Sequence, residues 1–184
     1  MAMTPVDVAY ERWVRSTLDR YEGPLIRYAA RITGDLEQAR DVVQDTFLRL
    51  CKADQARVED HMGEWLFTVC RNRALDVVRK ERRMNQLTET QAAQFVSRDP
   101  SPSAVAERRE TTSRVVRVLE TLSKNQQEVV RLRFQNGMSY KEISRITGHS
   151  VSNVGFLIHA AIKTLRQRLR TESDLVQEAG GSLS

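Results

Sequence analysis

Residues 139–163 read SYKEISRITGHSVSNVGFLIHAAIK, and this stretch decides the fold of the C-terminal half of the chain. Ser139 is placed to cap a short helix that carries two isoleucines three residues apart. Gly148 then interrupts the helical pattern, and Ser150 is placed to cap a longer helix. A short helix, a turn that contains glycine and a longer helix make up the helix-turn-helix motif. The sequence therefore predicts this motif, with an ordinary helical hairpin as the alternative.

The longer helix of the motif has an apolar side and a polar side. Its apolar residues recur at helical spacing and are expected to face inward: Val151, Val154, Ile158, Ala161, Leu165 and Leu169. The residues expected to face outward are Ser152, Asn153, Phe156, His159 and Lys163. Their polar groups can bond base edges or phosphates, and the phenylalanine can contact a thymine methyl group. Because the helix N-terminus at Ser150 also suits a phosphate, this face favours DNA binding.

A small helical domain surrounds the motif. Val115, Leu119 and Leu122 mark one helix, which ends near Ser123. Ser123 is placed to cap the next helix, whose apolar residues are Val129, Val130 and Phe134. We expect one domain over residues 112–170, followed by a disordered tail at 171–184.

A second helical domain is predicted over residues 8–83. A first apolar stripe, ended by Gly34, comprises Val14, Leu18, Tyr21, Leu25, Tyr28 and Ile32. Asp35 is placed to cap a second helix with the stripe Leu36, Ala39, Val43, Phe47 and Leu50. After a polar loop at residues 52–60, a third helix at 62–83 carries Leu66, Val69, Ala74, Val77 and Val78. Three helices of this length can enclose a small core.

A linker separates the two predicted domains at residues 84–111. Glutamine, threonine, serine and charged residues dominate it, and it contains the sequence DPSP at residues 99–102. Each proline disfavours a helical conformation in the residue before it. The fold class is therefore all-α, with two small helical domains joined by a flexible linker.

The charge of the chain is unevenly distributed. Residues 1–50 have a net charge of −1, residues 71–83 of +4 and residues 124–170 of +7. Two separate basic segments indicate two contacts with a polyanion, or alternatively two solvated helix faces.

Two further groups of side chains lie on helix faces in the N-terminal domain. Asn72, Asp76, Arg79, Lys80 and Arg83 share one face of the third helix, about two turns beyond Trp65. An amide, an aromatic ring and basic groups can follow a phosphate backbone and contact unstacked bases. Asp41 and Asp45 share one face of the second helix, beside Gln44 and Arg49. With no glycine-rich phosphate loop, histidine cluster or second acidic pair, they indicate a protein contact rather than catalysis.

Several classes of protein are disfavoured by the composition. Cys51 and Cys70 form no Cys-X-X-Cys motif or Cys/His cluster, so we expect neither a disulfide scaffold nor a zinc site, and both cysteines act as small apolar residues. No stretch is apolar enough for a signal peptide or a membrane span. We therefore expect a cytoplasmic protein without a cofactor.

The chain resembles the extracytoplasmic-function group of the sigma-70 family over about residues 10–170. DVVQDTFLRL at 41–50 resembles the segment of region 2 that docks on the clamp helices of the polymerase β′ subunit. EWLFTVCRNRALDVVR at 64–79 resembles the helix that reads the promoter −10 element. LSKNQQEVVRLRF at 122–134, followed by GMSYKEI at 137–143, resembles region 4, and the DPSP sequence is frequent in the family's linker.

The resemblance implies a role for each group of residues. Asp41, Gln44, Asp45 and Arg49 would contact core RNA polymerase, and the residues that would bind the −10 element are Trp65, Arg71, Asn72, Asp76, Arg79, Lys80 and Arg83, with the loop at 52–61. The −35 element would be bound in its major groove by Ser150, Ser152, Asn153, Phe156, His159 and Lys163. The resemblance also implies the β flap as a second contact on polymerase, and an anti-sigma factor as a partner.

The longer helix departs from the family pattern. Gly155, Leu157 and Ala160 stand where lysine or arginine is common in the family, although His159 is retained. Fewer basic groups mean fewer phosphate contacts and a weaker dependence of binding on salt. Phe156 and Leu157 have a protein contact as their alternative role.

Two other functions compete with a sigma factor. A stand-alone repressor or activator would use the helix-turn-helix alone, without polymerase, and would leave residues 41–50 and the basic third helix without a role. A helical nuclease or phosphohydrolase would use Asp41 and Asp45, but the sequence offers too few additional metal ligands.

Overall fold

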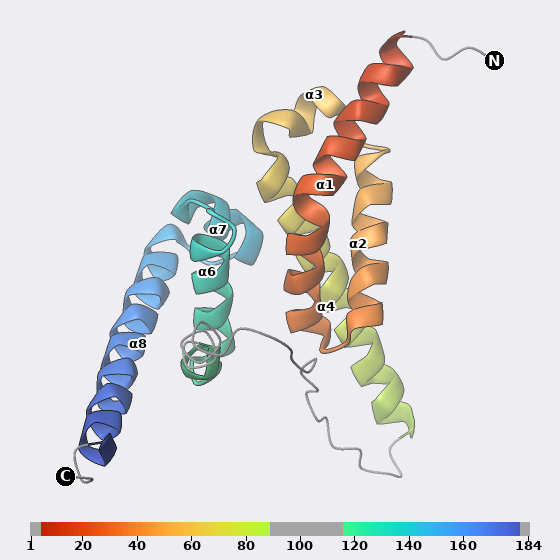
Figure 1. Ribbon diagram of the computed structural model, residues 1–184. Coiled ribbons are helices and arrows are strands. Elements are labelled where there is room, and N and C mark those ends of the chain that lie inside the picture. Colours follow the sequence, from red (N-terminus) through yellow and green to blue (C-terminus); the bar gives the residue numbers. More distant parts are fainter. Residues whose placement is uncertain (1–4, 89–115, 181–184) are drawn as a thin grey trace. The chain divides into compact units, whose positions relative to one another are not determined.

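The computed structural model describes residues 5–88 and 116–180, and within these ranges the regular structure is helical (Figure 1). The chain divides into two compact units, Met1–Arg98 and Asp99–Ser184, and each is described by itself. The predicted all-α fold with two small helical domains is confirmed.

The first unit consists of three long helices and a short connection. They are α1 (Pro5–Thr33), α2 (Leu36–Leu50), α3 (Gln55–Val58), the 3₁₀ helix η1 (Glu59–His61) and α4 (Met62–Thr88). Gly34 ends α1 with a backbone φ of 78°, a conformation that glycine adopts at little cost. The carboxylate of Asp35 then accepts a hydrogen bond from the backbone N–H of Gln38 (2.7 Å), which confirms the predicted cap of α2.

The core of the first unit lies where α1, α2 and α4 pack on one another. Its largest fully buried side chains are Leu25, Val42, Leu50, Leu66 and Phe67. Phe67 also meets Tyr28 edge to face, with 5.2 Å between ring centroids. Such a pair contributes about 0.5–1.5 kcal/mol beyond its burial, so helices α1 and α4 are joined at this point.

The polar segment at residues 52–60, predicted as a loop, contains the short helices α3 and η1 instead. Asp54 caps α3 through a hydrogen bond from the backbone N–H of Ala56 (3.2 Å), and Val58 is buried. The prediction was wrong because one buried valine and one local cap suffice to order so short a turn.

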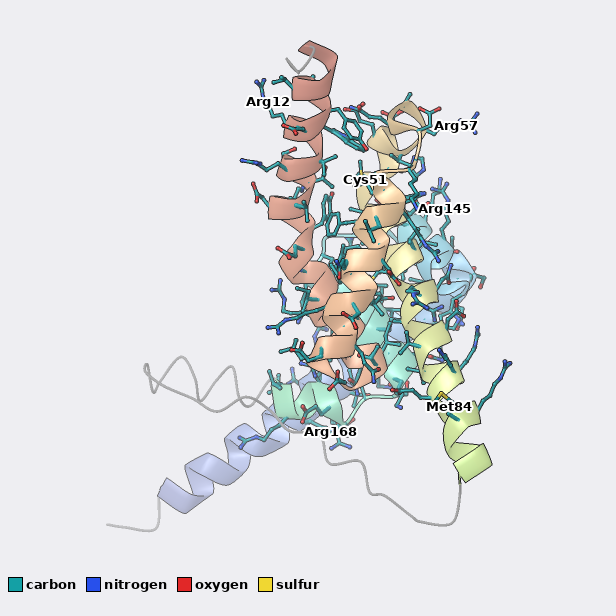
Figure 2. All side chains as sticks on the ribbon, turned by 90° about the vertical axis from the view of Figure 1, so that its right-hand side faces the viewer. Arg12, Cys51, Arg57, Met84, Arg145 and Arg168 are labelled. Carbon is teal, nitrogen blue, oxygen red and sulfur yellow. The ribbon has the colours of Figure 1, made fainter. Side chains whose placement is uncertain are left out.

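Helix α4 is longer than predicted. It continues from Arg83 to Thr88 and extends past the ends of α1 and α2 (Figure 1), so the first five residues of the predicted linker are helical. Residues 89–111 of that linker lie outside the described residues. In Figure 2 the Met84 side chain marks this projecting part of α4, and it is exposed together with Arg82 and Arg83.

The second unit contains helical residues 116–120, α6 (Lys124–Phe134), α7 (Tyr140–Thr147) and α8 (Val151–Gly180). Helices α6, α7 and α8 all contact one another, and their buried side chains include Leu122, Val129, Leu132, Ile143 and Val154. The tail that we expected to be disordered from Thr171 is helical as far as Gly180, and Val115 and residues 181–184 lie outside the described residues.

Three side chains expected to face inward are exposed: Leu36 (48%), Phe134 (62%) and Val151 (45%). Each is the first or last residue of its helix, in α2, α6 and α8 respectively. Helical spacing identifies the side of a helix on which a residue lies, but the terminal residue extends beyond the neighbouring helix that would cover it.

The two cysteines differ in their environment. Cys70 is fully buried, and burial raises its pKa to about 12, whereas Cys51 is exposed and was wrongly expected to act only as an apolar residue. Cys51 lies at the end of α2 near the first turns of α1 (Figure 2), where its backbone oxygen accepts a hydrogen bond from the Tyr10 hydroxyl (2.9 Å).

We predict that a chromogenic aryl disulfide reagent at about pH 8 modifies one thiol in the folded protein and two after denaturation. The thiolate is the reactive form, and the raised pKa and burial of Cys70 keep it protonated and out of reach. A Cys51→Ser chain should release no rapid colour until denaturant is added. Rapid reaction of that variant would contradict the prediction.

Candidate nucleic-acid interface

The turn between α7 and α8 is fixed by local hydrogen bonds. Gly148 ends α7 with a φ of 78°, and the Ser144 hydroxyl donates a hydrogen bond to the backbone oxygen of His149 (2.6 Å). The backbone N–H of Asn153 donates to the hydroxyl oxygen of Ser150 (3.2 Å), which confirms the predicted cap of α8. These bonds set the direction in which α8 leaves the turn, and Ile143 and Ile146 of α7 are buried as predicted.

One face of α8 is exposed along three turns. Since successive residues of an α-helix are about 100° apart, Ser152, Phe156, His159 and Lys163 project on the same side, with Asn153 beside them. The structure exposes all five and Ser150, and Phe156 has an exposed fraction of 70%. We call Ser152, Asn153, Phe156, His159 and Lys163 the α8 face.

An aromatic contact braces α8 against the start of α7. The Tyr140 ring lies next to Gly155, because a Cβ atom built on that glycine would be 3.6 Å from the ring. The Arg133 guanidinium lies over the Tyr140 ring, 5.5 Å from its centre. It also donates a hydrogen bond to the backbone oxygen of Met138 (2.9 Å). Gly155 therefore provides the surface of α8 on which the Tyr140 ring packs.

A capping box begins α7. The backbone N–H of Ser139 donates to the Glu142 carboxylate (2.7 Å), and the backbone N–H of Glu142 donates to the Ser139 hydroxyl oxygen (3.2 Å). Hydrogen bonds from the Ser139 side chain and then its backbone lower the pKa of Glu142 below its ordinary value of 4.5. The ionised carboxylate thus holds the first turn of α7 together.

We predict that α7 becomes less stable as the pH is lowered, because Glu142 takes up a proton. A carboxyl group with a lowered pKa in the folded state stabilises the fold above its unfolded pKa, and this contribution is lost as pH falls through the folded pKa. The loss therefore begins near the ordinary value of 4.5 and continues below it. Hydrogen exchange of the α7 amides, compared with a Glu142→Gln chain at each pH, measures the effect, because glutamine keeps the capping box but does not titrate. Equal pH dependence in both chains would contradict the prediction.

The second candidate face lies on α4. Asn72, Asp76, Arg79, Lys80 and Arg83 are exposed, and they follow one side of the helix for about three turns. Asp76 and Arg79 form an ion pair of 3.3 Å, so their charges offset each other. The net positive charge of these five residues therefore comes from Lys80 and Arg83. We call these five residues the α4 stripe.

Two residues predicted with the α4 stripe are less accessible. Trp65 is half-buried, on the same side of α4 but two turns earlier. Arg71 is half-buried and lies about 100° around the helix from Asn72, so the structure does not bring it to the stripe.

The third candidate face lies on α2, and we call it the α2 face: Asp41, Gln44, Asp45, Leu48 and Arg49. Asp41, Gln44 and Arg49 are exposed as predicted. The carboxylate of Asp45 instead forms an ion pair with Arg73 of α4 and accepts a hydrogen bond from its Nε atom (2.6 Å). Both side chains are about 40% exposed. Leu48 is 53% exposed.

Sequence reasoning missed Leu48 and Arg73. The position of Leu48, seven residues after Asp41 on the polar side of α2, was a signal that could have identified it. The partner of Arg73 lies on another helix, and no local pattern predicts such a pair. A groove of about 400 Å³ between α1 and α2 is lined by Gln44 and Leu48 together with Val14, Leu18, Glu22, Ile26, Arg40, Val43, Phe47 and Cys51.

The described residues offer no site for metal chemistry. Within residues 5–88 and 116–180, no three histidine, cysteine or acidic side chains lie close enough to hold a metal ion. None of the described helices is both long and apolar enough to cross a membrane. What the geometry does offer is two exposed faces with basic groups, one in each unit, and an acidic and apolar face in the first.

Two family models match the chain. The model for sigma-70 region 2 matches residues 10–84, which include α2, the α2 face and most of α4. The model for sigma-70 region 4 matches residues 112–165, which include α6, α7 and the α8 face.

Curated proteins and one solved structure extend this similarity. The chain is 32% identical over 164 residues to the ECF RNA polymerase sigma factor SigL of Mycobacterium tuberculosis, covering 85% of this chain and 89% of that protein. It is 27% identical over 151 residues to the ECF RNA polymerase sigma factor SigM of Bacillus subtilis, covering 82% and 88%. The fold is similar to that of the sigma factor RpoE in its complex with the anti-sigma factor NepR from Bartonella quintana, with a TM-score of 0.61, 23% identity and coverage of 88% and 97%.

Proposed function

The chain belongs to the sigma-70 family, in its extracytoplasmic-function (ECF) group, and from this premise we propose that its three faces divide the work of a sigma factor between two DNA elements and core RNA polymerase. It is a sigma factor, and its task is to direct core polymerase to promoters and to start transcription there. The residues that carry each part of this task are our proposal.

We assign the −35 element to the predicted domain over residues 112–170, which belongs to the second unit. The α8 face would enter the major groove, because the N-terminal residues of the second helix of such a motif contact base edges. The Ser150 cap presents the helix N-terminus to a phosphate. No acidic residue occurs between Ile143 and Arg170, so the phosphate backbone meets no like charge over this stretch.

We assign the −10 element to the predicted domain over residues 8–83, which belongs to the first unit. The α4 stripe would supply Lys80 and Arg83 to the phosphate backbone, together with Arg79 from its exposed ion pair with Asp76, and Asn72 to a base. Trp65 lies on the same side of α4 two turns earlier, and Arg71 would act from the adjoining side of the helix. Residues 52–61, ordered as α3 and η1, would hold a base that has left the stack. Flipping a base out costs a few kcal/mol, which the binding energy of the other contacts offsets.

We assign core polymerase to the α2 face. Asp41, Gln44 and Arg49 are exposed and can form charged and polar contacts, while Leu48 and the adjoining groove can bury apolar surface. The clamp helices of the β′ subunit are the proposed partner, and the β flap is the proposed partner of the second unit. Residues 84–111 would tether the two units, so that one contact raises the effective concentration of the other.

The remaining parts of the proposal follow from this role. A sigma factor supplies recognition while polymerase supplies the chemistry, so we propose no catalysis and no cofactor for this chain. It would act in the cytoplasm, where polymerase and promoter DNA are found. A protein that covers these faces, as an anti-sigma factor does, is the proposed regulator.

The observation that carries the assignment is the presence of two separate exposed faces with basic groups, one in each unit. Run-off transcription tests it: the purified chain with core polymerase and a library of promoter fragments is expected to yield discrete transcripts. A gel shift with and without core polymerase separates the sigma factor from a stand-alone repressor, because the repressor would bind DNA equally well in both. The absence of transcripts from every fragment would contradict the proposal.

A further inference from the structure

Phe156 is the most exposed of the large apolar side chains in the described residues, at 70%. It lies in the second turn of α8, and Gly155 beside it has no side chain to cover the ring. Leaving a phenylalanine in water forgoes about 1.5–3 kcal/mol of burial. Binding of a partner that covers the Phe156 ring would therefore be favourable.

The surroundings of Phe156 favour DNA over an apolar protein surface. Its neighbours on the α8 face are Ser152, His159 and Lys163, all exposed and all polar or basic. A protein interface that buried the ring would centre on several apolar groups, but the other four residues of the α8 face are all polar or basic, and Leu157 is half-buried on another side of α8. A single exposed ring within a polar, basic face fits a base edge in a groove lined by phosphates.

The first two turns of the α8 face lack the side chains that most often read guanine. Arginine or lysine binds the two acceptors of guanine in the major groove, yet none occurs between Ser150 and Ala160. Lys163 follows Phe156 by seven residues, about 10 Å along the helix axis. What the first two turns do present is a ring that can contact a methyl group, and thymine is the base that displays one in the major groove.

We propose that Phe156 determines specificity in the −35 element by packing its ring against the methyl group of a thymine. This inference rests on the proposed function of the α8 face and adds to it the base that the face selects. The −35 elements that this sigma factor selects accordingly contain a thymine whose methyl group contributes to binding, and that contribution passes through Phe156.

The test removes only the methyl group. Fragments with a randomised −35 region are selected by the full chain bound to core polymerase, and the selected sequence is resynthesised with deoxyuridine in place of each thymidine in turn. At one position, or at two adjacent ones, deoxyuridine is expected to weaken holoenzyme binding about fourfold, the factor for one buried methyl group. A Phe156→Ala chain is expected to bind the thymine fragment about fivefold more weakly and to bind both fragments equally.

Phe134→Ala is the matched control. Phe134 is 62% exposed in the same unit, but it is the last residue of α6 and does not belong to the α8 face. This variant is expected to keep the full preference for thymine.

The outcomes separate this inference from the proposed function. Tolerance of deoxyuridine at every position, or an undiminished thymine preference in Phe156→Ala, overturns the inference while run-off transcripts from the same fragments uphold the sigma factor. Wild-type promoter binding by Phe156→Ala also overturns it, in favour of a protein contact. The absence of any transcript overturns both.

Discussion

An Asp41→Arg chain is expected to lose at least about 30-fold in affinity for core RNA polymerase and to direct correspondingly little transcription. We propose that Asp41 meets a basic group of polymerase in a pair that the interface buries. Removing one partner of a buried, hydrogen-bonded charge pair costs about 2–5 kcal/mol, and 2 kcal/mol corresponds to about 30-fold. Reversal of the charge adds repulsion from the basic group that Asp41 is proposed to meet. The Asp41 side chain is exposed, so the substitution leaves the core of the first unit unchanged.

The measurement is retention of the labelled chain by immobilised core polymerase, followed by run-off transcription. Asp19→Arg is the matched control, since Asp19 is an exposed residue of α1 outside the α2 face and its replacement changes the net charge by the same amount. Equal losses in both variants would show a general effect of charge, and unchanged binding of Asp41→Arg would remove Asp41 from the interface.

A Phe67→Ala chain is expected to lose about 3–5 kcal/mol of stability in its first unit. Phe67 is 1% exposed and loses both its burial and its edge-to-face contact with Tyr28. Because small domains have only about 5–15 kcal/mol of stability in total, much of the first unit is expected to unfold at temperatures that the unchanged chain withstands.

Tryptophan fluorescence during urea denaturation measures this loss. The chain has two tryptophans, Trp13 and Trp65, and both belong to the first unit, so the signal follows that unit alone. Leu48→Ala is the control: this leucine is 53% exposed, and surface substitutions usually stay within about 0.5 kcal/mol. Coincident midpoints for the two variants would refute the predicted role of Phe67 in the core.

The parts of the structure that the sequence predicted well depend on local interactions. The caps at Asp35, Ser123, Ser139 and Ser150 form as predicted because a cap joins groups two or three residues apart. The exposure of the α8 face also followed from helical spacing alone.

The parts that sequence reasoning missed depend on distant neighbours. The pairing of Asp45 with Arg73 joins residues 28 positions apart on two helices, and no periodicity contains that information. The exposure of Leu36, Phe134 and Val151 depends on where the covering helix stops, which the packing of the whole unit decides. Arg71 was assigned from the resemblance, and its angular position on α4 separates it from the stripe.

The bond between Asp45 and Arg73 makes the two faces of the first unit energetically dependent on each other. A polymerase group that captured the Asp45 carboxylate would release the Arg73 guanidinium, leaving an unpaired positive charge on α4 beside the α4 stripe. By thermodynamic linkage, DNA that engaged Arg73 would equally free Asp45 for polymerase. For a half-exposed pair this linkage amounts to at most about 1 kcal/mol, or roughly fivefold. Each partner would then recruit the other by a modest and equal factor.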